Sequence, residues 1–241
     1  MWFKLESSET PRLKNPVLLV ATSTSVQQYR ALYSQARELA RYMLEKMKFE
    51  RIATLYSSSL GPEVLVRDDG TCALPACHLY LHRGKRDILL FAGDASPMDD
   101  QYEFSSVLLD YAKKAGVKEV YSVGARWAEN LVSAFQEPEI NGFASSSEAA
   151  SKLEKHNVKL IKSEAAPYFA SIVVAMAGSY DMEGYKLSVD HGEPAPHART
   201  VVRMLEVLSD MVGFQIDYEE LRSRIVAPPA MRSPDESNIY H

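Results

Sequence analysis

Residues 87–124, DILLFAGDASPMDDQYEFSSVLLDYAKKAGVKEVYSVG, decide the fold class of this chain. An apolar run at residues 88–92 ends at Gly93-Asp94, and a second run at residues 117–123 ends at Gly124. Between the two runs, apolar residues recur at three- and four-residue spacing and therefore share one helix face. These residues are Phe104, Val107, Leu108, Tyr111 and Ala112. A strand, a helix and a strand with tight connections predict a right-handed crossover between two parallel strands.

The turns that end these two strands are candidate ligand sites, because open parallel sheets bind ligands beyond the carboxyl ends of their strands. They are Gly93-Asp94 and Gly124-Ala125. The polar turn that begins at Gly93-Asp94 has two interpretations, a catalytic or ligand loop and a purely structural turn. In the structural interpretation, the glycine bends the chain and Asp99 or Asp100 caps the following helix. The Gly-rich patterns of phosphate-binding loops follow none of the expected strands.

The same alternation of strands and helices continues along the chain and predicts one α/β domain, residues 1–226. Five apolar residues in a row at 17–21 suit a central parallel strand that is buried on both faces. Ser145 and Glu148 have the spacing of a capping box, which marks a helix start. Further strands are expected at residues 2–6, 52–56, 140–144, 158–161 and 185–189. Helices are expected at residues 29–47, 126–136, 145–155, 167–177, 196–211 and 218–224.

Residues 64–82 interrupt this alternation and predict antiparallel strands. Residues 64–67 and 71–74 flank Asp69-Gly70, a pair typical of tight hairpin turns. Residues 78–82 continue as a strand into a turn at Gly84. We expect this inserted hairpin at the edge of the sheet or as a ribbon that projects from it.

Composition limits the function classes. The chain has 241 residues, 46% of them hydrophobic, so it is long enough for a sizeable core. Its net charge of −5 argues against nucleic acid or an anionic membrane as a partner. We find no apolar run near the roughly 18 residues of a membrane span, and the first ten residues lack the apolar core of a signal peptide. With only two cysteines, the chain is expected in the reducing cytoplasm.

Two groups of residues are candidates for chemistry. Cys72, Cys77 and His78 suggest a metal site, but a second ligand pair at suitable spacing is missing, which favours packing cysteines. Four titratable residues cluster near the last strand and permit an acid–base pair or a metal site. Nearby prolines favour instead a strand-to-helix loop whose acids cap the helix. The four are Asp190, His191, Glu193 and His197. We therefore assign no catalytic residues, no cofactor and no metal.

Residues 227–241, APPAMRSPDESNIYH, depart from the pattern, since they are rich in proline, serine and charge and can bury little surface. We expect a flexible tail. Its last three residues, Ile239, Tyr240 and His241, combine an aliphatic anchor, an aromatic hydroxyl and a terminal carboxylate. A pocket that captures C-termini grips groups of this kind.

The order of motifs resembles the proteasome assembly chaperone 2 family in its archaeal form, over residues 15–224. The resemblance rests on NPVLLVA, DILLFAGDASP, GVKEVYSVGA and SVDHGEPAPHARTVVRMLEVLSDMVGFQIDYEELRSR. It implies a three-layer α/β/α fold with a mostly parallel central sheet, similar to purine nucleoside phosphorylases, and assembly into homo-oligomers. Many relatives have a Gly-rich turn after the first central strand, where this chain has residues 22–25, TSTS.

The tail resembles a separate motif, the hydrophobic–tyrosine–any-residue ending of proteasome activators and assembly chaperones. That ending inserts between neighbouring α subunits of the core particle. By this resemblance, the His241 carboxylate pairs with a pocket lysine, the Tyr240 hydroxyl forms a hydrogen bond and Ile239 fills an apolar recess. A non-enzymatic proteasome-binding protein is therefore expected, with itself and a related family subunit as further partners.

A competing hypothesis is an enzyme or binder of a nucleotide or sugar phosphate with a phosphorylase-like fold. It would use the loops at Gly93-Asp94, Gly124-Ala125 and residues 190–197. A third hypothesis is an oligomeric scaffold without proteasome contact, in which the ending of the tail is coincidental.

Overall fold

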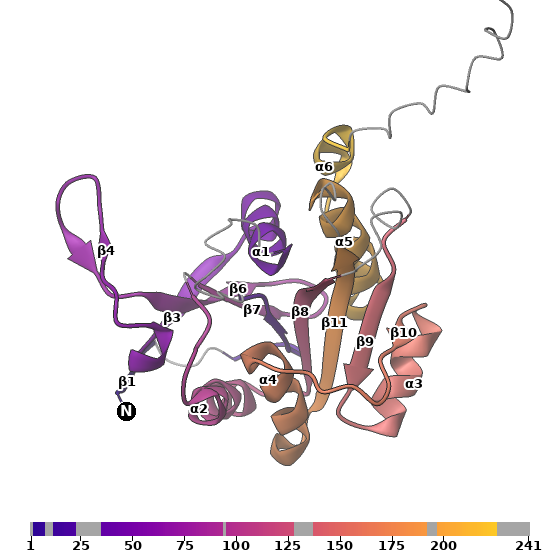
Figure 1. The fold of residues 1–241 in the computed structure, drawn as a ribbon, viewed down its shortest axis with the longest axis horizontal. Helices are drawn as coiled ribbons and strands as arrows, with labels where there is room; N and C mark the ends of the chain where they lie inside the picture. The colour runs from indigo at the N-terminus through magenta and orange to yellow at the C-terminus, as the bar shows by residue number, and fades with distance from the viewer. Residues whose placement is uncertain are drawn as a thin grey trace, which may run out of the picture.

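A nine-stranded sheet forms the middle layer of the structure, with helices on both faces (Figure 1). The computed structural model describes residues 2–7, 12–22, 35–93, 95–127, 137–191 and 197–225. The strands lie in the order β1-β3-β6-β7-β2-β8-β11-β9-β10. They are β1 (Phe3–Ser7), β2 (Val17–Val20), β3 (Glu50–Ser57), β6 (Ala76–His82), β7 (Ile88–Gly93), β8 (Glu119–Trp127), β9 (Ile140–Ala144), β10 (Lys159–Leu160) and β11 (Glu183–His191).

Four strands in the centre of the sheet, β7, β2, β8 and β11, run parallel. All four residues of β2 are buried, as expected for a central parallel strand. β2 lies between β7 and β8, so the crossover formed by residues 87–124 joins parallel strands that are not neighbours. The pairs β1–β3, β3–β6, β6–β7 and β9–β11 are antiparallel. The predicted parallel sheet thus forms the centre, and antiparallel strands extend it.

The helices divide into two layers. They are α1 (Gln35–Lys46), α2 (Gln101–Lys114), α3 (Ser147–Lys155), α4 (Phe169–Ala177), α5 (His197–Val212) and α6 (Glu219–Ser223). Apolar residues of α2 and α4 pack on one face of the sheet, and those of α1, α3 and α5 pack on the other. The short 3₁₀ helices η1 (Ser58–Leu60) and η3 (Gly178–Tyr180) follow β3 and α4. The predicted α/β/α fold is confirmed.

Helix α2 has the apolar face that its sequence predicts, since Phe104, Leu108 and Ala112 are each at most 2% exposed. Its carboxyl end is closed as a Schellman motif: the Gly116 amide donates to the Lys113 carbonyl and the Val117 amide to the Ala112 carbonyl, both at 3.0 Å. Gly116 has φ +82°, which glycine adopts without strain.

The predicted cap of α2 is only half right. Asp100 holds the N-cap position and its carbonyl accepts the Phe104 amide at 3.0 Å. Its backbone is left-handed, with φ 49°, and its side chain makes no capping hydrogen bond. The prediction from residue type assumed the extended backbone that directs a capping side chain toward the helix.

The inserted hairpin is confirmed as β4 (Leu65–Val66) and β5 (Cys72–Ala73), a two-stranded ribbon that projects from the sheet beside β3 (Figure 1). Its turn is held by the Asp69 carboxylate, which accepts the Thr71 amide at 2.9 Å. β6, the strand that follows, does not lie at the edge of the sheet but between β3 and β7.

Two local predictions were wrong. Residues 126 and 127 belong to β8 and not to a helix, and residues 128–136 lie outside the described part of the chain. The N-cap of α3 is Ser146, whose hydroxyl accepts the Ala149 amide at 3.1 Å. The neighbouring Ser145 hydroxyl instead accepts the Gly184 amide at 2.8 Å and ties the helix start to β11.

The domain boundary at residue 226 and the tail, residues 227–241, lie at and beyond the end of the described residues and stay predictions. None of the helices in the described ranges is long and apolar enough to cross a membrane.

Candidate functional site

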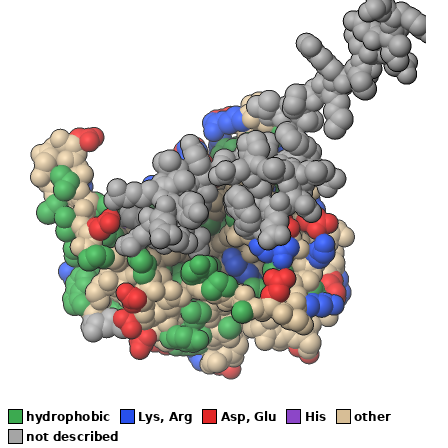
Figure 2. Space-filling model, in the orientation of Figure 1, with side chains coloured by type: hydrophobic (Ala, Val, Ile, Leu, Met, Phe, Trp, Pro, Cys, Tyr) green, Lys and Arg blue, Asp and Glu red, His purple; other side chains and the backbone are tan. Residues whose placement is uncertain are grey.

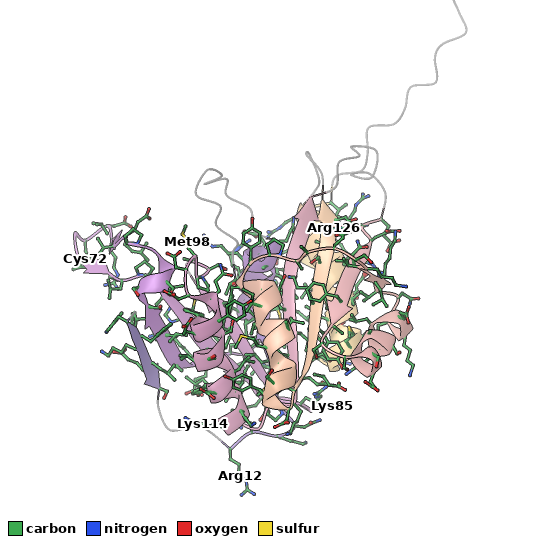
Figure 3. The ribbon with its side chains drawn as sticks, turned by 60° about the horizontal axis from the view of Figure 1, so that its bottom comes forward. Arg12, Cys72, Lys85, Met98, Lys114 and Arg126 are labelled. Carbon is green, nitrogen blue, oxygen red and sulfur yellow. The ribbon has the colours of Figure 1, made fainter. Side chains whose placement is uncertain are left out.

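The carboxyl ends of β7, β8 and β11 meet at one edge of the sheet, uppermost in Figure 1. An ion pair spans β8 and β11 at this edge. Arg126 donates from Nε to Asp190 Oδ1 at 2.9 Å and from Nη2 to Asp190 Oδ2 at 3.2 Å. Arg126 also lies 3.6 Å from Glu164, and Figure 3 shows it at the top of the sheet. The Asp190 carboxylate is thus paired with an arginine. Of the other predicted cluster members, Glu193 and the side chains of His191 and His197 lie outside the description.

The turn after β7 is held by structural contacts. A methyl group at Gly93 would lie 2.5 Å from the Ala76 carbonyl oxygen, so β6 and β7 approach closely there. The Cys77 thiol donates to the Ala95 carbonyl at 3.3 Å, and the Ser96 hydroxyl donates to Thr22 at 2.8 Å. Asp94 lies outside the described residues. These contacts favour the structural interpretation of the turn.

The two cysteines differ in environment. Cys77 is fully buried, as a packing cysteine should be, whereas Cys72 is exposed on the projecting hairpin. The packing prediction is therefore right for Cys77 and wrong for Cys72. His78 lies 3.1 Å from the Thr54 hydroxyl through Nδ1.

Lys186 is the residue at this edge that the sequence analysis missed. It lies in the middle of β11 and is only 7% exposed. A methyl group at Gly124 on β8 would lie 2.8 Å from the lysine Nζ, so the amine occupies the space above this glycine. Burial lowers the pKa of the amine to about 7. The sequence did contain a signal for this site: a lysine stands between Tyr185 and Leu187 in a strand that is otherwise apolar there.

Other buried polar groups lie on the same face of the sheet as Lys186. Ser122 is directly opposite Lys186 on β8 and is completely buried. Asn141 on β9 is opposite Ser188, two residues further along β11. The Ser122 hydroxyl and the Asn141 Nδ2 have no hydrogen-bond partner among the described residues. Such unsatisfied groups are rare in protein interiors, because each costs free energy.

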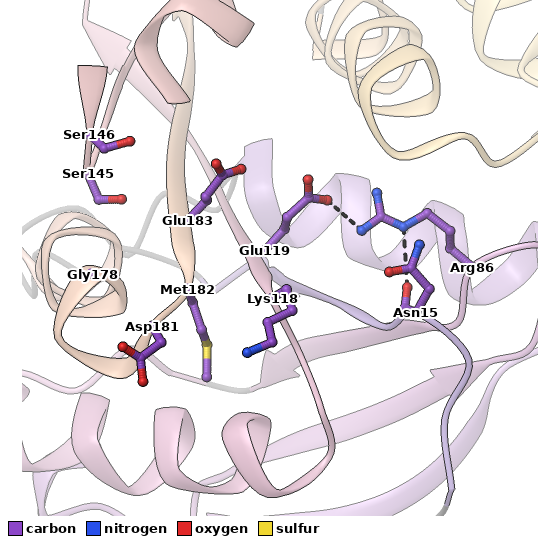
Figure 4. Close-up of a pocket in the computed structure, with 10 residues that line it drawn as sticks. All are labelled: Asn15, Arg86, Lys118, Glu119, Ser145, Ser146, Gly178, Asp181, Met182 and Glu183. Atoms are coloured by element: carbon purple, nitrogen blue, oxygen red, sulfur yellow. Dashed lines mark hydrogen bonds and ion pairs between the residues drawn. The ribbon is translucent and has the colours of Figure 1, made fainter. Parts of the chain in front are cut away.

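A cavity of about 570 Å³ lies at the opposite, amino edge of β8 and β11 (Figure 4). It is lined by Asn15, Arg86, Lys118, Glu119, Ser145, Ser146, Gly178, Asp181, Met182 and Glu183. Its three carboxylates already have partners. Glu119 pairs with Arg86, Asp181 with Lys113, and Glu183 accepts from the Tyr185 hydroxyl. The expected pocket was at the other edge, and the carboxylates that line this cavity take part in a network of ion pairs and hydrogen bonds.

Glu119 is the centre of that network. Its Oε2 lies 2.5 Å from Arg86 and its Oε1 lies 2.5 Å from Lys152. Burial acts to raise the pKa of this carboxyl, but hydrogen bonds from Lys152 and Arg86 outweigh it and hold the pKa below its ordinary value. Lys152 also lies 4.9 Å above the ring of Tyr185, which stacks on Tyr121. The network joins β8, β11 and α3.

The comparisons with known proteins place this fold in a family. The model of the PAC2 family matches residues 35–227, which is most of the chain. The chain belongs to the PAC2 family. A curated relative is an uncharacterized protein of Methanocaldococcus jannaschii, 22% identical over 192 residues, which cover 78% of this chain and 73% of the relative.

Solved structures similar to this PAC2 protein include two from Pyrococcus furiosus. PbaB, described as an archaeal proteasome activator, has a TM-score of 0.76 and 19% identity, covering 92% of this chain and 93% of that one. PbaA, described as an archaeal homolog of proteasome-assembly chaperone, has a TM-score of 0.71 and 19% identity, covering 92% and 86%. At these identities the likeness shows a shared fold.

The predicted binding residues of this PAC2 protein, Ile239, Tyr240 and His241, lie outside the described residues, so they stay a prediction. The described part of the chain ends just after α6. Leu221 of α6 is 6% exposed, and Glu220 pairs with Lys46 of α1 at 2.5 Å. α6 is therefore fixed to the body of the protein close to the point where the tail begins.

One end of this PAC2 protein carries exposed apolar side chains. They gather on the projecting hairpin and on β1, the neighbouring edge strand, and Figure 2 shows them in green along that side. We name Trp2, Leu5, Val64, Leu65, Val66 and Leu74 the apolar end. Val66 is 71% exposed and Val64 is 55% exposed. Exposed apolar side chains that gather at one end of a molecule are typical of an interaction surface.

Proposed function

We propose that this PAC2 protein binds the proteasome core particle and acts in its assembly or activation in the cytoplasm, without catalysis of its own. The observation that carries the proposal is the likeness to PbaB, a proteasome activator, and to PbaA, a homolog of proteasome-assembly chaperone, over 92% of this chain. Membership of the PAC2 family supports the same role.

The tail is the proposed contact, with His241 taken as the C-terminal residue. Ile239, Tyr240 and the His241 carboxylate would insert between α subunits of the core particle as an aliphatic anchor, a hydrogen-bonding hydroxyl and an anion. Residues 227–241, fully extended at about 3.4 Å each, span roughly 50 Å. α6, which precedes the tail in the sequence, is fixed to the body through Leu221.

A homo-oligomer would raise the affinity of this contact. A three-residue anchor buries little area and binds weakly by itself. Several tails on one assembly raise the effective concentration for each further contact, by about 10²-fold or more in avidity. We propose that copies of this chain associate through the apolar end, because its exposed valines and leucines would then be removed from water. A related family subunit is a second candidate for the partner that binds the apolar end.

The test is capture of archaeal core particles by three forms of the protein: wild type, a form that lacks residues 239–241, and Tyr240→Ala. We expect at least tenfold weaker capture by both altered forms, with unchanged melting temperatures. Asn238→Ala, one residue before the motif, is the matched control and should bind like wild type. Capture of wild-type strength by the truncated form would refute the role of the tail.

The position of the carboxylate gives a second test of the same contact. One alanine added after His241 keeps every side chain but moves the negative charge by one residue, about 3.4 Å in an extended chain. We expect binding to be lost. Full binding by the extended protein would leave the pairing of the carboxylate with a pocket lysine without support.

A further inference from the structure

The amine of Lys186 points toward the carboxyl edge of the sheet. Gly124, which the amine covers, is paired with Ser188, two residues after Lys186 on β11. The side chain therefore extends along the strand by about two residues, roughly 6.6 Å. Gly124 is partly exposed and Ala125 is exposed, so the amine ends directly beneath the surface of this edge.

The amine has no counterion within the described ranges. It makes no hydrogen bond or ion pair to a described residue, and β9 and α4, which flank it, contain no charged residue. The charged groups further along the same faces of β8 and β11 are Arg126 and Asp190, which bond each other, with Glu164 beside the arginine. A buried cation without a partner is costly, and a bound anion would remove that cost.

The first turn of α4 lies level with the backbone of Lys186, and its amide groups point along the helix axis toward the carboxyl edge, where the amine lies two strand residues further on. A methyl group at Gly184 would lie 2.3 Å from the Val174 carbonyl oxygen, which fixes α4 against β11. The four residues from Val174 back to Ala170 cover about 6 Å along the axis of α4. The two residues from Gly184 to Lys186 cover nearly the same distance, about 6.6 Å, along β11. Because α4 and β11 run in opposite directions in Figures 1 and 3, Ala170 reaches the level of Lys186.

This helix start has free amide groups. Tyr168 occupies the N-cap position but provides no capping side chain. The Tyr168 carbonyl accepts the amides of Ser171 and Ile172, while those of Phe169 and Ala170 have no partner among the described residues. The first turn of a helix carries a partial positive charge and attracts anions.

We propose that Lys186, the Ser122 hydroxyl and the first turn of α4 bind a tetrahedral oxyanion, the phosphate or sulfate group of a small molecule. The site offers one buried ammonium group, an unsatisfied hydroxyl on the neighbouring strand and free backbone amides, and all of these donate hydrogen bonds. The unsatisfied Asn141 Nδ2 adds a donor on the same face. The proposal is independent of proteasome binding through the tail.

Protonation of the amine should govern the affinity for the anion. In the free protein, the pKa of Lys186 is about 7, and a bound anion would raise it. Above pH 7, binding must therefore take up a proton and becomes weaker. Between pH 6 and pH 8 the dissociation constant should rise by about tenfold. Sulfate is the clean probe, because it does not titrate in this range.

The test is isothermal titration calorimetry of the full-length protein with sodium sulfate and inorganic phosphate at constant ionic strength. We expect wild type to bind both anions, with the rise in the sulfate dissociation constant from pH 6 to pH 8. Lys186→Met should bind neither anion, even at an anion concentration ten times the wild-type dissociation constant. Lys155→Met, which removes an exposed lysine from α3, is the control and should bind like wild type.

Ser122→Ala is a second variant for the case that Lys186→Met does not fold. It removes only an unsatisfied hydroxyl, so the protein should fold and bind sulfate at least threefold more weakly. Three results would overturn the proposal: no sulfate or phosphate binding by wild type, equal binding by folded Lys186→Met, or binding of acetate at equal strength to sulfate. Sulfate binding by wild type that does not change with pH would count against Lys186 as the cationic group.

Discussion

At the scale of single residues, the partly buried Glu119 and the buried Lys186 have opposite environments. Glu119 is satisfied by two cations, whereas Lys186 is buried without an anion. Both lie in strands that the sequence predicts well, yet neither environment was predictable. The partners of Glu119 come from residues 86 and 152, and the neighbours of Lys186 come from residues 122 and 124. Their approach depends on strand order and register, which no local pattern of residues contains.

Glu119→Gln should destabilise the protein at neutral pH by about 1–3 kcal/mol, because Arg86 and Lys152 lose their shared anion. The pKa of this carboxyl is lowered in the folded state, so its contribution is complete above the unfolded pKa of about 4.3. It is lost as the pH falls through the folded value. Urea unfolding of wild type and variant at pH 7 and pH 3.5 should show a difference that shrinks in acid.

Glu154→Gln is the control for this measurement. Glu154 is exposed on α3, and the change removes one negative charge without breaking an ion pair that the structure contains. An equal loss of stability in both variants at pH 7 would mean that net charge, and not the network around Glu119, is responsible.

At the scale of elements, the sequence predicted the features that depend on residues close together in the chain. The apolar face of α2 follows from residue spacing and is confirmed, and the end of the helix at Gly116 reflects the backbone preference of glycine. The position of β6 between β3 and β7 and the wrong choice of Ser145 as helix cap were decided by contacts with distant segments. Fold analogy predicted a pocket at the carboxyl edge of the sheet, but the cavity of about 570 Å³ among the described residues lies where β8 and β11 begin.

Gly184→Ala tests the closest contact between α4 and the sheet. The added methyl group would meet the Val174 carbonyl oxygen at 2.3 Å and its carbon at 3.0 Å, so the helix must shift. We expect a loss of about 1–3 kcal/mol in the free energy of unfolding. Gly178→Ala is the matched control, because the nearest atom to its methyl group is 4.0 Å away. Thermal unfolding followed by circular dichroism compares the two, and equal melting temperatures would contradict the close packing.

At the scale of the whole molecule, the alternating pattern of the sequence predicted an α/β domain, and the family resemblance implied its three α/β/α layers. The family resemblance is confirmed by the match over residues 35–227. The apolar end was not predicted as a surface. Its residues come from β1 and its neighbour Trp2 and from the hairpin, which are separated by about sixty residues in the chain. The pairing of β1 with β3, the strand that precedes the hairpin, brings them to the same end of the sheet.

Val66→Asp should weaken self-association through the apolar end. The side chain is 71% exposed, so the stability of the single subunit should change by less than about 0.5 kcal/mol. A charge buried between two subunits costs much more. Sedimentation velocity should show a shift toward smaller species. Ser151→Asp, which adds the same charge on the exposed side of α3, should leave the assembly intact. An unchanged assembly in Val66→Asp would place the contact elsewhere.

The place of β2 between β7 and β8 has a consequence for biosynthesis. β2 is complete at Val20, but its partners β7 and β8 end at Gly93 and Trp127. At roughly 5–20 residues per second, the ribosome needs on the order of 5–20 s to produce the second partner. During that time, four fully apolar residues have an unpaired edge in the nascent chain. The order of synthesis therefore leaves this apolar strand without its partners for longer than a strand that pairs with its neighbour in the sequence.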